Sequence, residues 1–125
     1  MKLKFILGSL FLMFSFSVFA DGKNIFDRYC TACHSPSMAP MFASPAAHDK
    51  SAWDVRKNDA LKKAIAKNPA VRGAVGNQKE EFILEELVLS AVTGTDNGMP
   101  PKGTCNDCTD EQIKSAIIYM SNESN

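Results

Sequence analysis

The sequence predicts an all-α fold, and three observations support that prediction. Apolar residues recur at intervals of three and four in four separate segments, which is the pattern of helices with one buried face. No segment shows the strict alternation of apolar and polar residues that is typical of a half-buried strand. Loops rich in proline and glycine separate the helical segments. The length of 125 residues fits one globular domain.

The first two predicted helices lie in the N-terminal half of the chain. Residues 24–30 place an isoleucine and two aromatic residues on one face. A loop with three prolines follows over residues 35–51, and the second helix is expected over residues 53–67. This helix ends before Pro69, because proline lacks the amide hydrogen that a continuing helix requires.

The other two predicted helices lie in the C-terminal half. Residues 80–93 carry an apolar stripe behind an acidic first turn, and Gly94 suits the end of this helix. After a loop over residues 95–108, Thr109 and Gln112 have the spacing of a capping box. The helix that they open is expected to run to about residue 119 and to bury four residues, namely Ile113, Ala116, Ile117 and Met120.

The first twenty residues predict a secretory signal peptide. Two lysines precede an apolar run over residues 5–19, and Ala20 supplies the small side chain before a cleavage site. We expect cleavage rather than anchoring, because the apolar run is shorter than the roughly 20 residues that span a bilayer. The mature protein is then a single domain over residues 21–125, exported to the periplasm, with no stable membrane insertion.

The charge balance argues against a nucleic-acid partner. Lys and Arg together number 14, as do Asp and Glu, so the chain has no excess of basic residues. After signal cleavage the basic residues fall to 12 and the acidic residues remain 14. Such a domain is not expected to bind phosphate backbones.

Residues 30–34 read Cys-Thr-Ala-Cys-His, which is the C-x-x-C-H sequence that attaches c-type haem. At the end of a helix this spacing places the thiols of Cys30 and Cys33 on one side, where they add to the two vinyl groups of haem. His34 is then directed at the iron as its proximal ligand. The pattern predicts one covalent haem c.

Two other interpretations of this motif exist. A zinc site would need a second pair of ligands, and Cys105 and Cys108 supply such a pair in principle. A thioredoxin-type redox motif would need a βαβ context, which this sequence does not show.

An electron-carrying haem needs a second axial ligand, and Met99 is the predicted one. It lies in a Gly-Met-Pro-Pro loop, where the prolines stiffen the backbone around one thioether. Met38 and Met41 follow the attachment motif too closely to reach the opposite face of the haem, and Met120 is expected in the core. Methionine opposite histidine raises the reduction potential relative to two histidines. His48 is the alternative ligand.

Cys105 and Cys108 form a second C-x-x-C, which lacks a following histidine and therefore does not predict a second haem. In an oxidising compartment a disulfide is the simplest fate of two such thiols. It would hold the Met99 loop against the last helix. A catalytic dithiol is the alternative.

Together these residues resemble the cytochrome c5 family, a branch of the class I c-type cytochromes. The resemblance rests on the haem motif, on Pro45, on residues 49–53 and on Arg56. Its most distinctive part is the Met-Pro-Pro-Lys-Gly run followed by C-x-x-C at residues 99–108. The resemblance implies a small class I cytochrome c fold, with helices wrapped around one covalent haem.

Carried over residue by residue, the resemblance implies three pairings: axial ligands His34 and Met99, thioether bonds at Cys30 and Cys33, and a disulfide between Cys105 and Cys108. It implies that the Pro45 carbonyl accepts the ring N–H of His34, which makes that ligand more basic. It also implies that Trp53 and Arg56 lie near the haem edge and its propionates. For Trp53, plain core packing is the alternative.

Two features depart from the family. Glycine is typical where this chain has His48, which is either a spare ligand near the haem or a solvent-facing loop residue. The segment from Asn58 to about Glu86 is longer than the family's usual link. We therefore predict a longer than usual central helical insertion.

The expected function is single-electron transport between respiratory partners, not enzymatic catalysis. The expected partners are redox proteins, such as a membrane cytochrome complex or a terminal oxidase or reductase. The alternative is a haem-based sensor or peroxidase-like domain with a labile sixth ligand, in which His48 would act as a distal acid–base group. A third interpretation is dithiol–disulfide exchange through Cys105 and Cys108.

Overall fold

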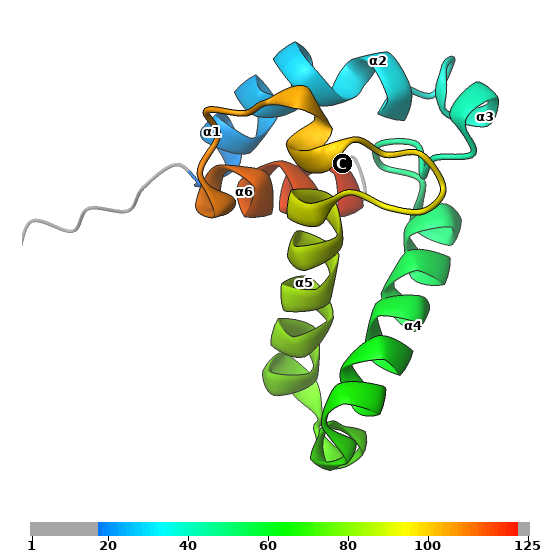
Figure 1. Ribbon diagram of the computed structural model, residues 1–125, viewed down its shortest axis with the longest axis vertical. Coiled ribbons are helices and arrows are strands. Elements are labelled where there is room, and N and C mark those ends of the chain that lie inside the picture. The colour runs from blue at the N-terminus through cyan, green and yellow to red at the C-terminus, as the bar shows by residue number, and fades with distance from the viewer. Residues whose placement is uncertain (1–17, 123–125) are drawn as a thin grey trace, which may run out of the picture.

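The structure, a computed structural model, describes residues 18–122 and consists of helices joined by loops (Figure 1). Residues 1–17, which hold most of the predicted signal peptide, lie outside the described residues. No strand occurs between residues 18 and 122, which confirms the all-α prediction. The elements are α1 (Val18–Ile25), η1 (Phe26–Cys30), α2 (Thr31–His34), α3 (Ala39–Phe42), α4 (Lys50–Lys67), η2 (Pro69–Gly73), α5 (Gly76–Thr93), η3 (Pro101–Thr104) and α6 (Asp110–Ser121).

A nearly continuous helical run carries the haem-attachment motif. The helix α1 passes into the π-helical turn η1, and α2 follows directly and ends at His34. The helix expected over residues 24–30 is thus part of a longer run. Isolated π turns frequently occur at functional sites, and this one ends on Cys30.

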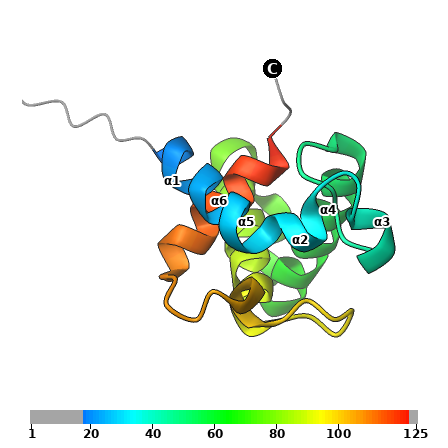
Figure 2. The same cartoon turned by 90° about the horizontal axis from the view of Figure 1, so that it is seen from above.

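The helices α1 and α6 cross in close contact at one end of the molecule, as both views show (Figures 1 and 2). Their contact permits no side chain at Gly22, because a Cβ atom there would lie 2.2 Å from the carbonyl oxygen of Ser115. The Phe26 ring packs on Tyr119 with centroids 5.3 Å apart. The four residues that were expected to face inward from the last helix are all buried, which confirms its predicted face.

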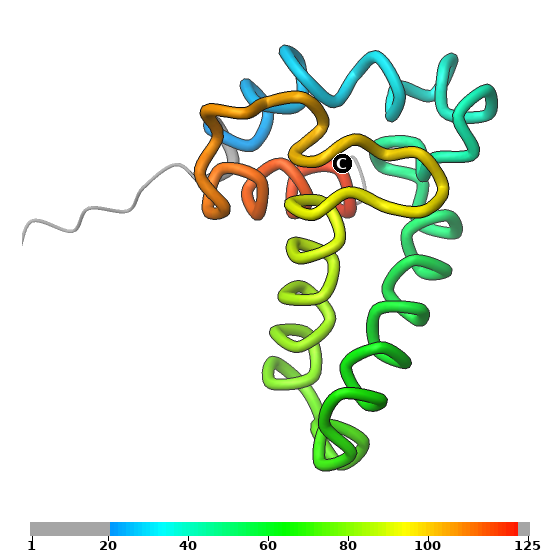
Figure 3. The backbone as a smooth tube through the Cα atoms, in the orientation of Figure 1, coloured from blue at the N-terminus to red at the C-terminus, as the bar shows by residue number. Residues whose placement is uncertain are grey.

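The helices α4 and α5 form an antiparallel hairpin that projects from the rest of the molecule (Figure 3). Each has 18 residues and is therefore about 27 Å long. Ala60 and Ala64 of α4 and Ile83 and Ala91 of α5 are buried, and Lys67 binds both carboxylate oxygens of Glu86 at 2.6 and 2.8 Å. The segment from Asn58 to Glu86, which is predicted as a central helical insertion, lies within this hairpin and is mostly helical.

The helix ends follow local sequence signals more closely than the helix starts do. The stop before Pro69 and the end at Gly94, whose φ is +85°, are as predicted. Thr109 and Gln112 form the predicted capping box at the start of α6. However, α4 begins at Lys50 and not at residue 53, because the Asp49 carboxylate caps it by accepting the Ala52 amide at 3.1 Å.

Within residues 18–122, no helix combines the length and the apolar character that crossing a bilayer requires.

Candidate haem site

His34, the last residue of α2, is buried and its ring orientation is fixed. Its Nδ1 donates to the carbonyl oxygen of Pro45 at 2.8 Å, and its own carbonyl accepts the Ala47 amide at 2.7 Å. Because Nδ1 carries the hydrogen, Nε2 is the nitrogen that is left to bind a metal. Burial lowers the pKa of His34, the bond to Pro45 opposes that shift, and the charge of Arg56 adds to it. The lowered pKa favours the neutral imidazole, which is the form that binds iron.

The loop of residues 43–46 fixes this histidine because its backbone receives side chains from two other segments. Three of its four carbonyl groups each accept one side-chain donor: Ala43 accepts from Arg56 Nη2 (2.9 Å), Pro45 from His34 Nδ1 (2.8 Å) and Ala46 from Trp53 Nε1 (2.9 Å). The start of α4 and the end of α2 are thus tied to the same short loop.

Trp53 and Arg56 are residues of α4 that lie near His34 and its loop. Trp53 is buried, and its ring is nearly parallel to the imidazole, with centroids 6.3 Å apart and an angle of 21° between planes. Arg56 is half-buried and donates to the loop. Both interpretations of Trp53, as a core residue and as a residue beside the haem site, are compatible with this position.

Ser44 is a contributor that sequence reasoning missed. Its hydroxyl donates to the carbonyl oxygen of Cys33 and lies 3.5 Å from that of Ala39. It therefore joins the loop before Pro45 to the attachment motif itself. The only hint in the sequence is a hydroxyl residue directly before a proline, which is too common a pattern to identify a contact between segments eleven residues apart.

Cys30 and Cys33 are free thiols in the structure, the first buried and the second half-buried. Burial raises the pKa of the Cys30 thiol to about 11, and the neighbouring Cys33 adds to the increase. Reactive dithiols of the thioredoxin type have a thiol with a lowered pKa, and the raised pKa of Cys30 is the opposite of that. In the described part of the chain, no three His, Cys, Asp or Glu side chains gather as a metal site, and the zinc interpretation gains no support.

Met99 lies on a loop whose backbone is fixed by a tight turn. Its amide donates to Thr95 Oγ1 at 3.2 Å, and its carbonyl accepts the Thr95 amide at 3.0 Å. A Cβ atom at Gly94 would lie 3.0 Å from the Met99 carbonyl oxygen, so the turn requires glycine there. The half-buried Met99 side chain packs against the core. Met120 is buried in the core as predicted, whereas Met41 is 76% exposed.

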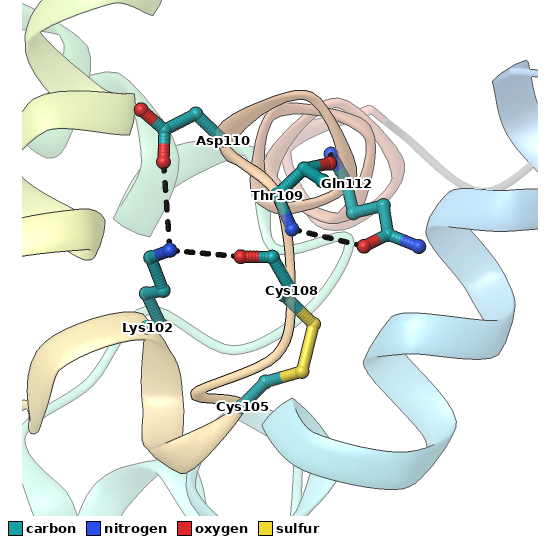
Figure 4. Close-up of polar contacts among 6 residues, drawn as sticks. All are labelled: Lys102, Cys105, Cys108, Thr109, Asp110 and Gln112. Carbon is teal, nitrogen blue, oxygen red and sulfur yellow. Dashed lines mark hydrogen bonds and ion pairs between the residues drawn. A yellow bond between two sulfur atoms is a disulfide. The ribbon is translucent and has the colours of Figure 1, made fainter.

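Cys105 and Cys108 are joined by a disulfide in the structure and are both buried (Figure 4). Their Cα atoms are 5.4 Å apart. The bond lies between the Met99 loop and the first residue of α6.

His48 binds the end of α6. Its amide donates to the Met120 carbonyl at 2.7 Å, its Nδ1 donates to the Asn122 carbonyl at 2.7 Å, and its ring meets the Tyr119 ring edge-on at 4.8 Å. Its φ of +66° lies in the left-handed region, which explains why glycine suits this position. With its ring bound to α6, His48 is not placed as a distal acid–base group.

These side chains fit haem c. Two free thiols precede a buried imidazole whose ring N–H is already bound, and a thioether sits on a fixed loop elsewhere in the chain. Thiols, imidazole and thioether are the groups that attach and ligate haem in c-type cytochromes. The fold and these groups define a c-type cytochrome.

Comparison with known proteins identifies the family. A family model described as cytochrome c oxidase, cbb3-type, subunit III matches residues 17–120. Cytochrome c5 of Azotobacter vinelandii is 32% identical over 101 residues, which cover 81% of this chain and 92% of that protein. Cytochrome c5 of Ectopseudomonas mendocina is 31% identical over 81% of this chain and 87% of its own length. Cytochrome c-555 of Prosthecochloris aestuarii is 30% identical over 83% and 86%. No solved structure matches the chain.

The chain belongs to the cytochrome c5 family of class I c-type cytochromes. It is therefore a haem-containing electron carrier and not an enzyme.

Proposed function

We propose that this protein is a periplasmic cytochrome that carries single electrons on one haem c, with His34 and Met99 as axial ligands. The observation that carries the proposal is the buried His34, whose Nδ1 is bound to Pro45 and which directly follows two free thiols. Haem, when bound, supplies an iron that changes its charge by one electron. Its partners are redox proteins that give and accept that electron.

The residues of this chain have distinct parts in that task. The bond from His34 to the Pro45 carbonyl makes the imidazole a stronger donor and prevents it from turning. The Met99 thioether favours the reduced state and thus a higher reduction potential. Trp53 and Arg56 keep the 43–46 loop in place, so that the imidazole does not need to reorganise when the electron arrives.

The proposal includes export and two covalent changes. Export removes the signal peptide by cleavage after Ala20. Cys30 and Cys33 then bind the haem. Cys105 and Cys108 form a disulfide. Intact mass measurement of the purified protein tests all three, because the expected mass is that of residues 21–125 plus one haem, less two hydrogens. Alkylation without reductant should label no cysteine, and alkylation after reduction should label two.

The ligation by Met99 is tested by optical spectra of the protein expressed with its signal peptide in a host that matures c-type haem. The oxidised protein should show the weak near-infrared band of methionine-ligated haem, and Met99→Ala should lose it. Met41→Ala is the matched control, because Met41 is an exposed methionine that lies outside the core. It should keep the band.

Absence of the band in the wild type, together with ready binding of carbon monoxide by the reduced protein, would contradict the ligation by Met99. A band that persists in Met99→Ala would assign the second axial position to another residue. The dithiol-exchange function gains no support, since both sulfurs of the Cys105–Cys108 bond are buried.

A further inference from the structure

We infer that Lys102 is a positioning residue for Met99, because it fastens the turn behind the Met99 side chain to the start of α6. This inference rests on the proposed ligation by Met99. It gives a role to the lysine of the Met-Pro-Pro-Lys-Gly run.

The Lys102 side chain points toward Cys108 and Asp110 at the start of α6 (Figure 4). Its Nζ donates to the carbonyl oxygen of Cys108 at 2.8 Å and lies 3.7 Å from a carboxylate oxygen of Asp110. The side chain is 26% exposed, whereas Lys50 and Lys62, which form ion pairs on the surface, are 63% and 77% exposed. A lysine placed in this way is not available as a surface charge for docking. Its ammonium group forms an internal, charge-assisted hydrogen bond.

The backbone at Lys102 is in a conformation that a lysine rarely adopts. Its φ is +55°, and the next two residues, Gly103 and Thr104, have φ values of +57° and +71°. The left-handed region costs free energy for residues with a Cβ atom, so that a lysine there indicates a compensating interaction. The bond from Nζ to the Cys108 carbonyl is such an interaction, because it closes the segment from residue 102 to residue 108.

The acceptor is itself held in place from two sides. Cys108 is joined by its sulfur to Cys105, and the residue after it, Thr109, forms the capping box of α6 with Gln112 (Figure 4). The carbonyl oxygen of Cys108 is therefore a fixed point at the start of α6. The hydrogen bond from the Lys102 ammonium group therefore holds the turn at residues 102–104 in a fixed position relative to α6.

The turn at residues 102–104 lies against the end of the Met99 side chain. A Cβ atom on Gly103 would lie 3.9 Å from the Met99 methyl carbon and 3.8 Å from the carbonyl oxygen of Tyr29. A Cβ atom at Gly103 would thus be in van der Waals range of both the thioether and the helical run that carries the attachment motif, so the turn lies beside both. If the turn loosens, the surface that supports the thioether moves with it.

The test is a titration of the oxidised holoprotein with imidazole, which competes with Met99 for the iron. The apparent affinity for imidazole rises in proportion to the loss of methionine binding, as for any ligand that needs the open state. We expect Lys102→Gln to bind imidazole about tenfold more tightly than the wild type, which is the size expected from loss of one charge-assisted hydrogen bond. Lys102→Arg should restore most of the wild-type value, and Met99→Ala gives the upper limit.

Two further variants separate the side chain from the backbone. Lys102→Gly removes the ammonium group but accepts the positive φ, so it folds without strain and should still bind imidazole more tightly than the wild type. Asp110→Asn should have little effect, because Asp110 is 67% exposed and its carboxylate lies 3.7 Å from Nζ. Lys114→Gln is the matched control: Lys114 is 29% exposed and pairs with Glu81 at 3.1 Å, away from the Met99 loop.

The outcomes distinguish this inference from the function on which it rests. If the wild type binds imidazole as tightly as Met99→Ala does, Met99 is not the ligand and the proposed ligation fails. If Met99→Ala differs from the wild type but Lys102→Gln and Lys102→Gly do not, the ligation stands and the role of Lys102 is overturned. An equal effect of Lys114→Gln or of Asp110→Asn would also overturn it, because the bond to the Cys108 carbonyl would then not be the cause.

Discussion

The imidazole of His34 and the indole of Trp53 lie nearly parallel, with ring centroids 6.3 Å apart, while the indole N–H donates to the Ala46 carbonyl at 2.9 Å. The same loop therefore receives the ring N–H of His34 and that of Trp53 at neighbouring residues, Pro45 and Ala46. This arrangement makes the orientation of the imidazole dependent on α4, a helix that begins sixteen residues further along the chain.

Trp53→Phe should separate the hydrogen bond of Trp53 from its packing. Phenylalanine keeps an aromatic ring beside His34 but leaves the Ala46 carbonyl without the indole donor. We expect a loss of about 1 to 2 kcal/mol in the free energy of unfolding of the holoprotein, measured with guanidinium chloride. Trp53→Ala should cost about 3 to 5 kcal/mol, because it also leaves a cavity. A Trp53→Phe protein as stable as the wild type would show that the bond to Ala46 contributes nothing.

Gly22→Ala should destabilise the contact between α1 and α6. The added methyl group would lie 2.2 Å from the Ser115 carbonyl oxygen, so the two helices must move apart. Overpacking of this kind costs about 1 to 3 kcal/mol, measurable as a lower thermal midpoint. Gly73→Ala is the matched control, because a Cβ atom at Gly73 has no neighbour within 4 Å. Equal midpoints for the two variants would contradict the close crossing.

His48→Ala and His48→Gly should differ in stability, and the backbone conformation at residue 48 decides which variant is more stable. Both variants lose the bond from the ring to the Asn122 carbonyl, but only alanine must adopt a φ of +66° with a Cβ atom. We expect His48→Gly to be more stable than His48→Ala by about 1 kcal/mol in guanidinium unfolding. The reverse order would mean that this loop is not left-handed in solution.

Asp49→Asn should alter the pH dependence of stability on the acid side. Hydrogen bonds from the Ala52 amide and the Ser51 hydroxyl lower the pKa of Asp49 below its ordinary value of 3.8. The carboxylate therefore stabilises the folded state fully above that ordinary value, and this contribution is lost as the pH falls through the lowered pKa. The thermal midpoints of wild type and variant should differ at neutral pH and approach each other in acid. A difference that stays constant in acid would rule out this source of stability.

The sequence predicted the features that depend on neighbouring residues. The capping box at Thr109, the helix end at Gly94 and the stop before Pro69 are all determined within one turn of chain. The attachment motif is likewise continuous, so that its residues could be named directly. The apolar face of the last helix followed from spacing alone.

The features that sequence reasoning missed depend on side-chain orientation or on contacts that no residue pattern marks. The early start of α4 comes from the cap that Asp49 forms. The orientation of the Asp49 side chain cannot be read from the sequence. The short helix α3 lies in a stretch without periodic pattern, where only folding decides the backbone. The bonds of Lys102 and Ser44 end on backbone carbonyl groups, and every residue type supplies such a group. No residue pattern therefore marks them in advance.

The contact between Gly22 and Ser115 also has a consequence for the order in which the protein is assembled. During synthesis α6 is the last helix to emerge, so the close crossing of α1 with α6 cannot form until almost the whole chain exists. The attachment motif begins at Cys30, where η1, the turn that follows α1, ends. The helical run that carries the motif therefore receives its packing against α6 only when the final helix is present.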